Sequence, residues 1–116
     1  MAFNDLLIQD YIIHDKWQAL VKMAQLEGDW YPYKIDDLAI EKILQKQANN
    51  LEPEAWLRVM VKLGEACFDQ GRLNLGERVL LKAVEGLEKQ LPDLSPERRA
   101  DVGNTYFILC QNAGKI

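Results

Sequence analysis

The sequence predicts an all-α protein built from about five antiparallel helices. Apolar residues recur at helical spacing, and no segment alternates apolar and polar residues with the period of a strand. Glycines recur every 43 residues, at Gly28, Gly71 and Gly114, and Pro53 and Pro96 share that interval. A fixed period of this length is typical of stacked αα hairpins. The 116 residues suit a single domain.

The first predicted helix spans about residues 5–27. Its apolar stripe falls on one helical face, at offsets i, i+4, i+7, i+8 and i+11: Ile13, Trp17, Leu20, Val21 and Ala24. The second predicted helix spans about 35–50. The acidic residues near its start, Asp36, Asp37 and Glu41, are of the kind that the helix macrodipole favours. Its apolar stripe comprises Ile40, Ile43, Leu44 and Leu51.

Three further helices are predicted, over about 53–70, 74–90 and 96–113. Pro53 and Pro96 suit the first helical position, and Asn74 with Glu77 reads as a capping box. Shifting the first stripe by 43 residues gives Trp56, Met60, Leu63, Gly64 and Cys67, and the fourth helix carries Leu80, Ala83, Val84 and Leu91. We expect these residues to be buried between helices: Trp17, Leu20, Trp56, Met60, Leu63, Leu80, Ala83 and Val84.

These positions resemble one tetratricopeptide repeat: Leu63-Gly64, Cys67-Phe68, Gly71, Gly76, Leu80 and Ala83-Val84. The 43-residue period is similar to the longer repeats of the kinesin-light-chain type, and residues 91–96 to their extended linker. The resemblance implies a right-handed αα-hairpin solenoid forming one domain over 1–116. Its parts would be repeat 1 at about 5–51, repeat 2 at about 53–91 and a half repeat at about 96–116.

Charge and composition disfavour several function classes. The 14 basic and 18 acidic residues are interspersed, whereas a nucleic-acid partner requires a basic face. No apolar run reaches the roughly 18–20 residues that span a bilayer, and the N-terminus lacks a basic secretion signal. The two cysteines make no disulfide framework. We therefore expect a cytoplasmic protein with no nucleic-acid partner and no membrane span.

No pattern indicates catalysis, a cofactor or a metal. His14 is the single histidine and has no companion ligands, and no phosphate-binding loop or zinc spacing occurs. Cys67 and Cys110 hold equivalent places on successive helices, roughly 8–10 Å apart. That separation exceeds the roughly 4.4–6.8 Å that a disulfide requires between Cα atoms, so core packing is favoured over a reactive thiol. The sequence predicts that this protein is not an enzyme.

The family resemblance implies a protein-interaction module that binds a segment of another protein in a concave groove. Side chains beside the apolar stripes are the groove candidates: Gln18, Lys22, Gln25, Arg58, Val61, Glu65, Phe68, Asp101, Asn104, Ile108 and Gln111. Asp15, Glu65 and Asp101 stand where the family's clamp for a C-terminal carboxylate would want cations or amides, which disfavours that ligand. Residues 30–33, Trp-Tyr-Pro-Tyr, are either a recognition patch or a local cap, and the cap is favoured.

A second interpretation is an oligomerisation or sensor and regulatory segment of a larger assembly containing such repeats. The last predicted helix is apolar around more than half its circumference, as an uncovered interface would be. A two-fold dimer would cover Tyr106, Phe107 and Leu109. Truncation from a longer array is the competing explanation, in which the next helix would cover them.

Overall fold

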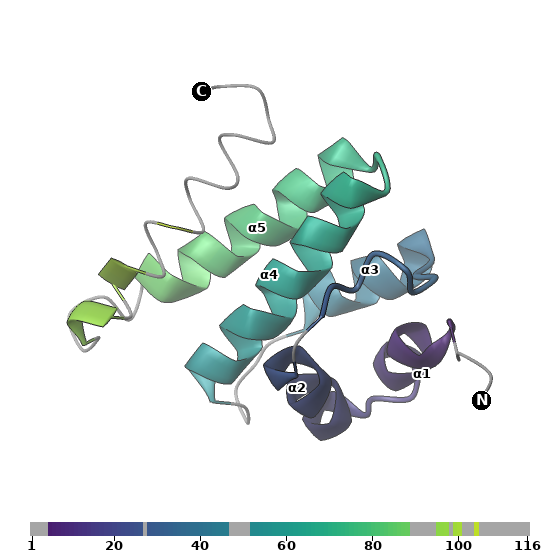
Figure 1. Ribbon diagram of the computed structural model, residues 1–116, viewed down its shortest axis with the longest axis horizontal. Helices are drawn as coiled ribbons and strands as arrows, with labels where there is room; N and C mark the ends of the chain where they lie inside the picture. Colours follow the sequence, from purple (N-terminus) through teal and green to yellow (C-terminus); the bar gives the residue numbers. More distant parts are fainter. Residues whose placement is uncertain are drawn as a thin grey trace.

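The computed structural model describes residues 5–26, 28–46, 52–88, 95–97, 99–100 and 104. Five α-helices and no strand occur in these ranges (Figure 1): α1 Leu7–Ile13, α2 Trp17–Gln25, α3 Asp37–Gln45, α4 Pro53–Asp69 and α5 Leu73–Glu88. The all-helical prediction is confirmed for them. The predicted helix 96–113 falls mostly outside the described residues, but residues 96, 97, 99, 100 and 104 are helical and Arg99 N–H donates to the Ser95 carbonyl.

The prediction of one continuous helix over 5–27 is wrong, because the chain breaks between α1 and α2. Asp15 adopts a left-handed conformation with φ +58°. The Asp15 N–H donates to the Ile12 carbonyl and the Lys16 N–H to the Tyr11 carbonyl. These two bonds make a Schellman motif, which ends α1. The break leaves Ile13 44% exposed, although it was expected on the buried stripe, and Ile12 is buried instead.

The same motif ends α4 and turns the chain into the antiparallel α5. Gly71, with φ +78°, donates its N–H to the Phe68 carbonyl, and the Arg72 N–H reaches the Cys67 carbonyl. Only residues 70–72 separate the two helices, which therefore lie side by side along their length (Figure 1). Asn74 lies inside α5, so the expected capping box with Asn74 as N-cap is not formed.

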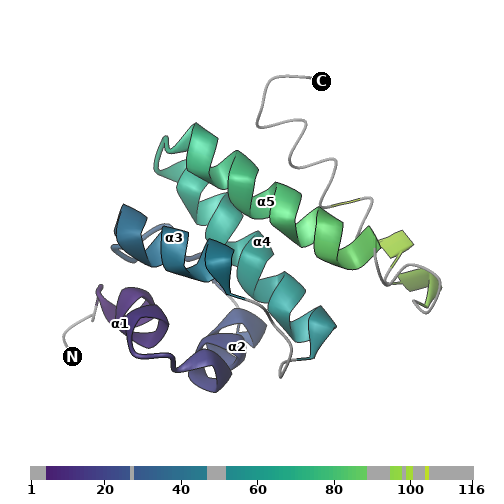
Figure 2. The same cartoon turned by 180° about the vertical axis from the view of Figure 1, so that it is seen from behind.

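The remaining helices pack around this hairpin (Figure 2). Trp17 at the start of α2 meets Trp56 near the start of α4 edge to face, with ring centroids 5.8 Å apart. Lys62, further along α4, reaches the end of α2, so α2 and α4 run in the same direction. α1, rather than α2, is the main packing partner of α3, and the first hairpin therefore differs from the simple pair that was expected.

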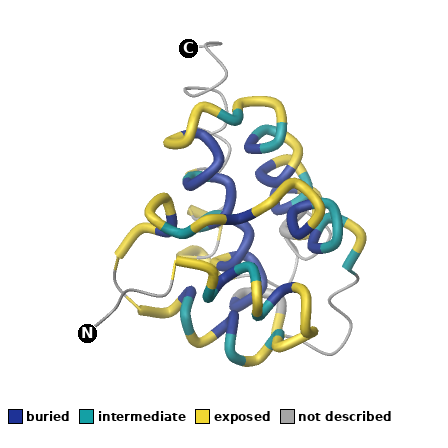
Figure 3. The backbone as a smooth tube through the Cα atoms, turned by 90° about the vertical axis from the view of Figure 1, so that its right-hand side faces the viewer, coloured by how far each residue is buried: buried dark blue, intermediate teal, exposed yellow. Residues whose placement is uncertain are grey.

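The core lies between these helices (Figure 3). Seven of the eight residues expected to be buried are buried. The eighth, Trp17, is partly exposed, and the Lys46 ammonium lies 5.2 Å from the centroid of its ring. Trp30 is 2% exposed, which confirms that this member of the aromatic turn caps the core. No helix in the described ranges is both long enough and apolar enough to traverse a lipid bilayer.

Polar side chains tie the helix ends and loops together. Lys42 donates to the Ile13 carbonyl at the end of α1 and forms an ion pair with Asp15 at 3.1 Å. Gln70 donates to the Tyr31 and Tyr33 carbonyls, which fixes the loop before α3. Arg72 donates to the Ile35 carbonyl and pairs with Asp37. Asp37 therefore joins α3 to the α4–α5 turn. As an acid in the first turn of α3, it is also favoured by the dipole of that helix.

Candidate partner-binding surface

The outer faces of α2 and α4, with Asp29 of the loop that follows α2, form the candidate surface. We call it the α2–α4 face and define it by six residues: Gln18, Lys22, Asp29, Arg58, Glu65 and Asp69. Gln18, Lys22, Arg58 and Asp69 are exposed, and Glu65 is half-buried. The two helices are parallel neighbours, fixed to each other at Trp17–Trp56 and again at Lys62. Lys22 lies between these two points along α2, as Arg58 does along α4. The structure thus brings four of the predicted groove residues onto neighbouring helices.

Phe68 was expected to line the groove, and this expectation is wrong. Its side chain is 8% exposed and packs with Leu80. The ring lies against Gly76, since a methyl group at that glycine would be 3.2 Å from Phe68 ring atoms. The absence of a side chain at Gly76 therefore leaves room for Phe68 to turn into the α4–α5 interface. Val61, also expected in the groove, is partly buried and packs against both apolar clusters.

The groove residues expected from the last helix cannot be placed on this surface. Asp101 and Ile108 lie outside the described residues, as do Tyr106, Phe107 and Leu109 of the predicted dimer interface. Asn104 is described, and it is helical and exposed. The surface supported by contacts is therefore confined to α2, α4 and the loop that follows α2.

One stripe along α4 carries charges at helical spacing: Arg58, Lys62, Glu65 and Asp69. Lys62 is engaged, because its ammonium donates to the Leu26 carbonyl at 3.2 Å and also to the Gly28 carbonyl. These carbonyls lie at the end of α2, where a cation is favoured by the helix dipole. Sequence reasoning did not identify Lys62, since its role depends on which helix end the fold places beside it.

Glu65 lies in an unfavourable electrostatic environment. Burial raises the pKa of its carboxyl, and the negative charges of Asp29 and Asp69 raise it further, while Lys62 lowers it. The net effect is a raised pKa, and burial is its largest cause. A cation supplied from outside would relieve this environment.

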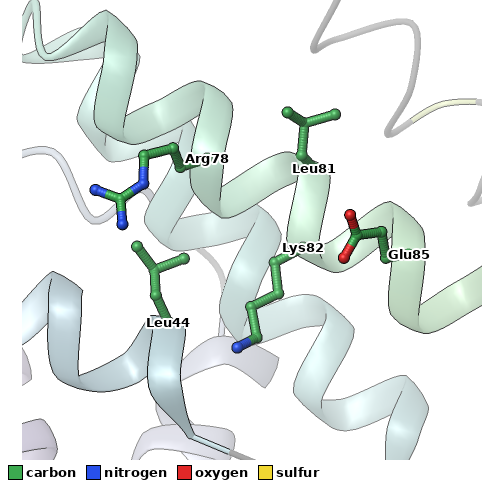
Figure 4. A pocket seen from close by; sticks show the side chains of 5 residues that line it. All are labelled: Leu44, Arg78, Leu81, Lys82 and Glu85. Atoms are coloured by element: carbon green, nitrogen blue, oxygen red, sulfur yellow. The ribbon is translucent and has the colours of Figure 1, made fainter.

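Two opposite charges are paired where α3 meets α5. Arg78 on α5 makes a bidentate ion pair with Glu41 on α3, and this pair lowers the pKa of Glu41. An open depression of about 330 Å³ lies beside the pair (Figure 4), lined by Leu44, Arg78, Leu81, Lys82 and Glu85. No sequence pattern indicates this depression, because it arises where α3 and α5 lie parallel. Its Arg78 guanidinium is already paired with Glu41.

Reactive side chains do not gather in the part of the chain that the structure describes. No group of three or more His, Cys, Asp or Glu residues there is arranged to hold a metal ion. Cys67 is buried, and burial raises the pKa of its thiol. A neutral, enclosed thiol agrees with the packing role expected for it, and Cys110 lies outside the described residues.

Comparisons with protein-family models, curated proteins and solved structures found no significant match to this chain.

Proposed function

We propose that this chain is a non-catalytic protein-interaction module whose α2–α4 face binds a segment of a partner protein. One observation carries the proposal: Lys22 and Arg58 are exposed on two neighbouring parallel helices, and neither has an ion-pair partner among the described residues. By contrast, ion pairs join Asp37 to Arg72, Glu41 to Arg78 and Lys42 to Asp15. The side chains of Lys22, Arg58 and Glu65 make no hydrogen bond or ion pair with another described residue, although Lys62 is close enough to Glu65 to lower the pKa of its carboxyl. Charges without internal partners are available to a partner molecule.

The helix arrangement supports a tetratricopeptide-like architecture as part of the proposal. α4 and α5 form an antiparallel hairpin, and α2 runs parallel to α4. α3 also runs parallel to α5, because Asp37 meets Arg72 and Glu41 meets Arg78. Corresponding helices of successive hairpins in a solenoid run parallel in this way. The split between α1 and α2 is a departure from the simple two-helix repeat.

The cellular setting and the assembly state complete the proposal. We place the protein in the cytoplasm, because its two cysteines make no disulfide framework, and we propose a protein or peptide as its partner. We propose no nucleic-acid partner, because the charges are interspersed and net negative at −4. We also propose a homodimer through Tyr106, Phe107 and Leu109. Light scattering over a hundredfold concentration range should show a mass above 13.4 kDa that rises with concentration. A constant monomer mass would contradict the dimer.

The binding function is tested by affinity capture with three forms of the full chain. The wild type, Arg58→Glu and Lys34→Glu would each be immobilised and exposed to extract from the native cell. Lys34 is exposed on the loop between α2 and α3 and gives the same charge change away from the face. A partner that the wild type and Lys34→Glu retain but Arg58→Glu loses, and that binds again as a purified segment, supports the proposal. Equal retention by all three forms contradicts it.

A further inference from the structure

The charges on the α2–α4 face are separated along the helices, and the first half is basic. Lys22 and Arg58 lie between the Trp17–Trp56 contact and the Lys62 contact, so both occupy the same stretch of the two parallel helices. Both are exposed, and neither has an ion-pair partner among the described residues. Gln18 lies one turn before Lys22 and adds an uncharged hydrogen-bonding group. This half of the face is complementary to an acidic side chain.

The second half of the face is acidic and borders exposed apolar side chains. Asp29 is exposed and directly follows Gly28, whose carbonyl accepts a hydrogen bond from Lys62, so Asp29 lies beside the turn of α4 that carries Glu65. Lys62 is held by the Leu26 and Gly28 carbonyls. Leu26 is 59% exposed beside this point, although it follows a helix whose apolar face is buried. This half is complementary to a basic side chain whose aliphatic stem contacts an apolar surface.

The distance between the two halves sets the spacing of the complementary charges. Arg58 and Glu65 are seven residues apart on α4, which corresponds to about 10 Å along the helix axis. An extended peptide covers that distance in about three residues, and a helical peptide in about seven.

We infer that the partner segment pairs an acidic side chain with Lys22 and Arg58 and a basic side chain with Asp29 and Glu65. This inference rests on the proposed function and specifies the chemistry of its partner. The acid and the base of the segment are three positions apart where it is extended and seven apart where it is helical. A segment with only one sign of charge leaves half of the face without a counter-charge.

A displayed library of random 12-residue peptides provides the probe. It would be panned against the immobilised wild-type chain, Arg58→Gln and Glu65→Gln. Lys34→Gln and Glu85→Gln are the matched controls, since each removes the same charge from an exposed site off the face. Wild-type and control pools should be enriched in an acid and a base at one of the two spacings. The Arg58→Gln pool should be less enriched in the acid and equally enriched in the base, and the Glu65→Gln pool should show the reverse.

A synthetic peptide from the wild-type pool then gives a quantitative test. Each glutamine variant should weaken its binding roughly two- to fivefold, as expected for one solvent-exposed charge pair. Removing the matching charge from the peptide should abolish that difference. Amide shifts in a nuclear magnetic resonance titration locate the bound peptide.

The outcomes separate this inference from the proposed function. Peptides that shift the amide signals of α2 and α4 but carry no acid and base at either spacing overturn the inference and leave the proposed function intact. Failure to enrich any peptide overturns the inference, while the proposed function is judged by capture with Arg58→Glu. Peptides that shift only the amide signals around the depression lined by Leu44 and Leu81 contradict both the inference and the proposed function.

Discussion

Gly64 and Leu80 are in direct contact where α4 crosses α5. A methyl group added at Gly64 would lie 2.7 Å from both Cγ and Cδ2 of Leu80, which is itself fully buried. The glycine thus permits a close approach that no larger residue allows. Gly64 is therefore a packing residue, which explains why the helix tolerates a glycine that costs roughly 0.5–1 kcal/mol relative to alanine.

Substituting leucine at Gly64 should destabilise the protein by about 1–3 kcal/mol, because it overpacks the crossing. Gly86 is the matched control, since it lies in α5 with nothing within 4 Å of its added methyl group. Gly86→Ala should stabilise the protein by roughly 0.5–1 kcal/mol through helix propensity alone. Urea denaturation measures both changes. An unchanged midpoint for Gly64→Leu would show that α4 and α5 do not cross at this residue.

Replacing Asp15 tests the break between α1 and α2. Asp15→Gly and Asp15→Ala both remove the ion pair with Lys42, so their difference reports the backbone conformation at φ +58°. The left-handed region disfavours alanine, and the glycine variant should be more stable by about 1 kcal/mol. Thermal or urea denaturation measures the difference. If Asp15→Ala were the more stable variant, the helix would continue through this position.

Glu65 should make the stability depend on pH. Its pKa is raised in the folded state, chiefly by burial, so the folded protein binds the proton more tightly than the unfolded chain. The contribution of Glu65 to stability is therefore most favourable below the ordinary glutamate value of 4.5, and it falls as pH rises from that value through the raised pKa. Glu65→Gln removes this loss, and its advantage over the wild type should grow with pH. A constant difference between the two unfolding free energies across that window would contradict the assignment.

Cys67 should be unreactive in the folded protein. Its thiol is buried and has a raised pKa, chiefly through desolvation, so little thiolate is available to a reagent. In a Cys110→Ser variant, Cys67 is the remaining cysteine, and labelling by a thiol reagent near neutral pH should be about 100-fold slower folded than in urea. Equal labelling rates in the two states would place this side chain at the surface.

The positions of the helices could be predicted wherever the apolar residues of a helix follow one uninterrupted stripe that packs against a neighbouring helix. Trp56, Met60, Leu63 and Cys67 share one face of α4 and are all buried, as their spacing requires. The break at Asp15 could not be predicted in this way, because apolar residues continue on both sides of it. A left-handed aspartate carries no sequence signal as clear as the glycine at Gly71.

The candidate surface could be predicted only in part, because tertiary contacts decide which side chains of α4 reach the surface. Periodicity places Arg58 and Glu65 off the apolar stripe of α4, where the structure also finds them accessible to solvent to different degrees. It places Phe68 there too, but the space left by Gly76 draws that ring into the α4–α5 interface. The engagement of Lys62 by the end of α2 depends on contacts between distant segments, which no local pattern records.

The central claim is that the α2–α4 face binds the partner. Titrating ¹⁵N-labelled protein with the partner segment recovered by affinity capture tests it most directly. We expect the largest amide shift changes at Gln18, Lys22, Arg58 and Glu65. We also expect Arg58→Glu to weaken binding and Lys34→Glu to leave it unchanged. Shift changes confined to Leu44, Leu81 and their neighbours, with these four amides unmoved, would contradict it.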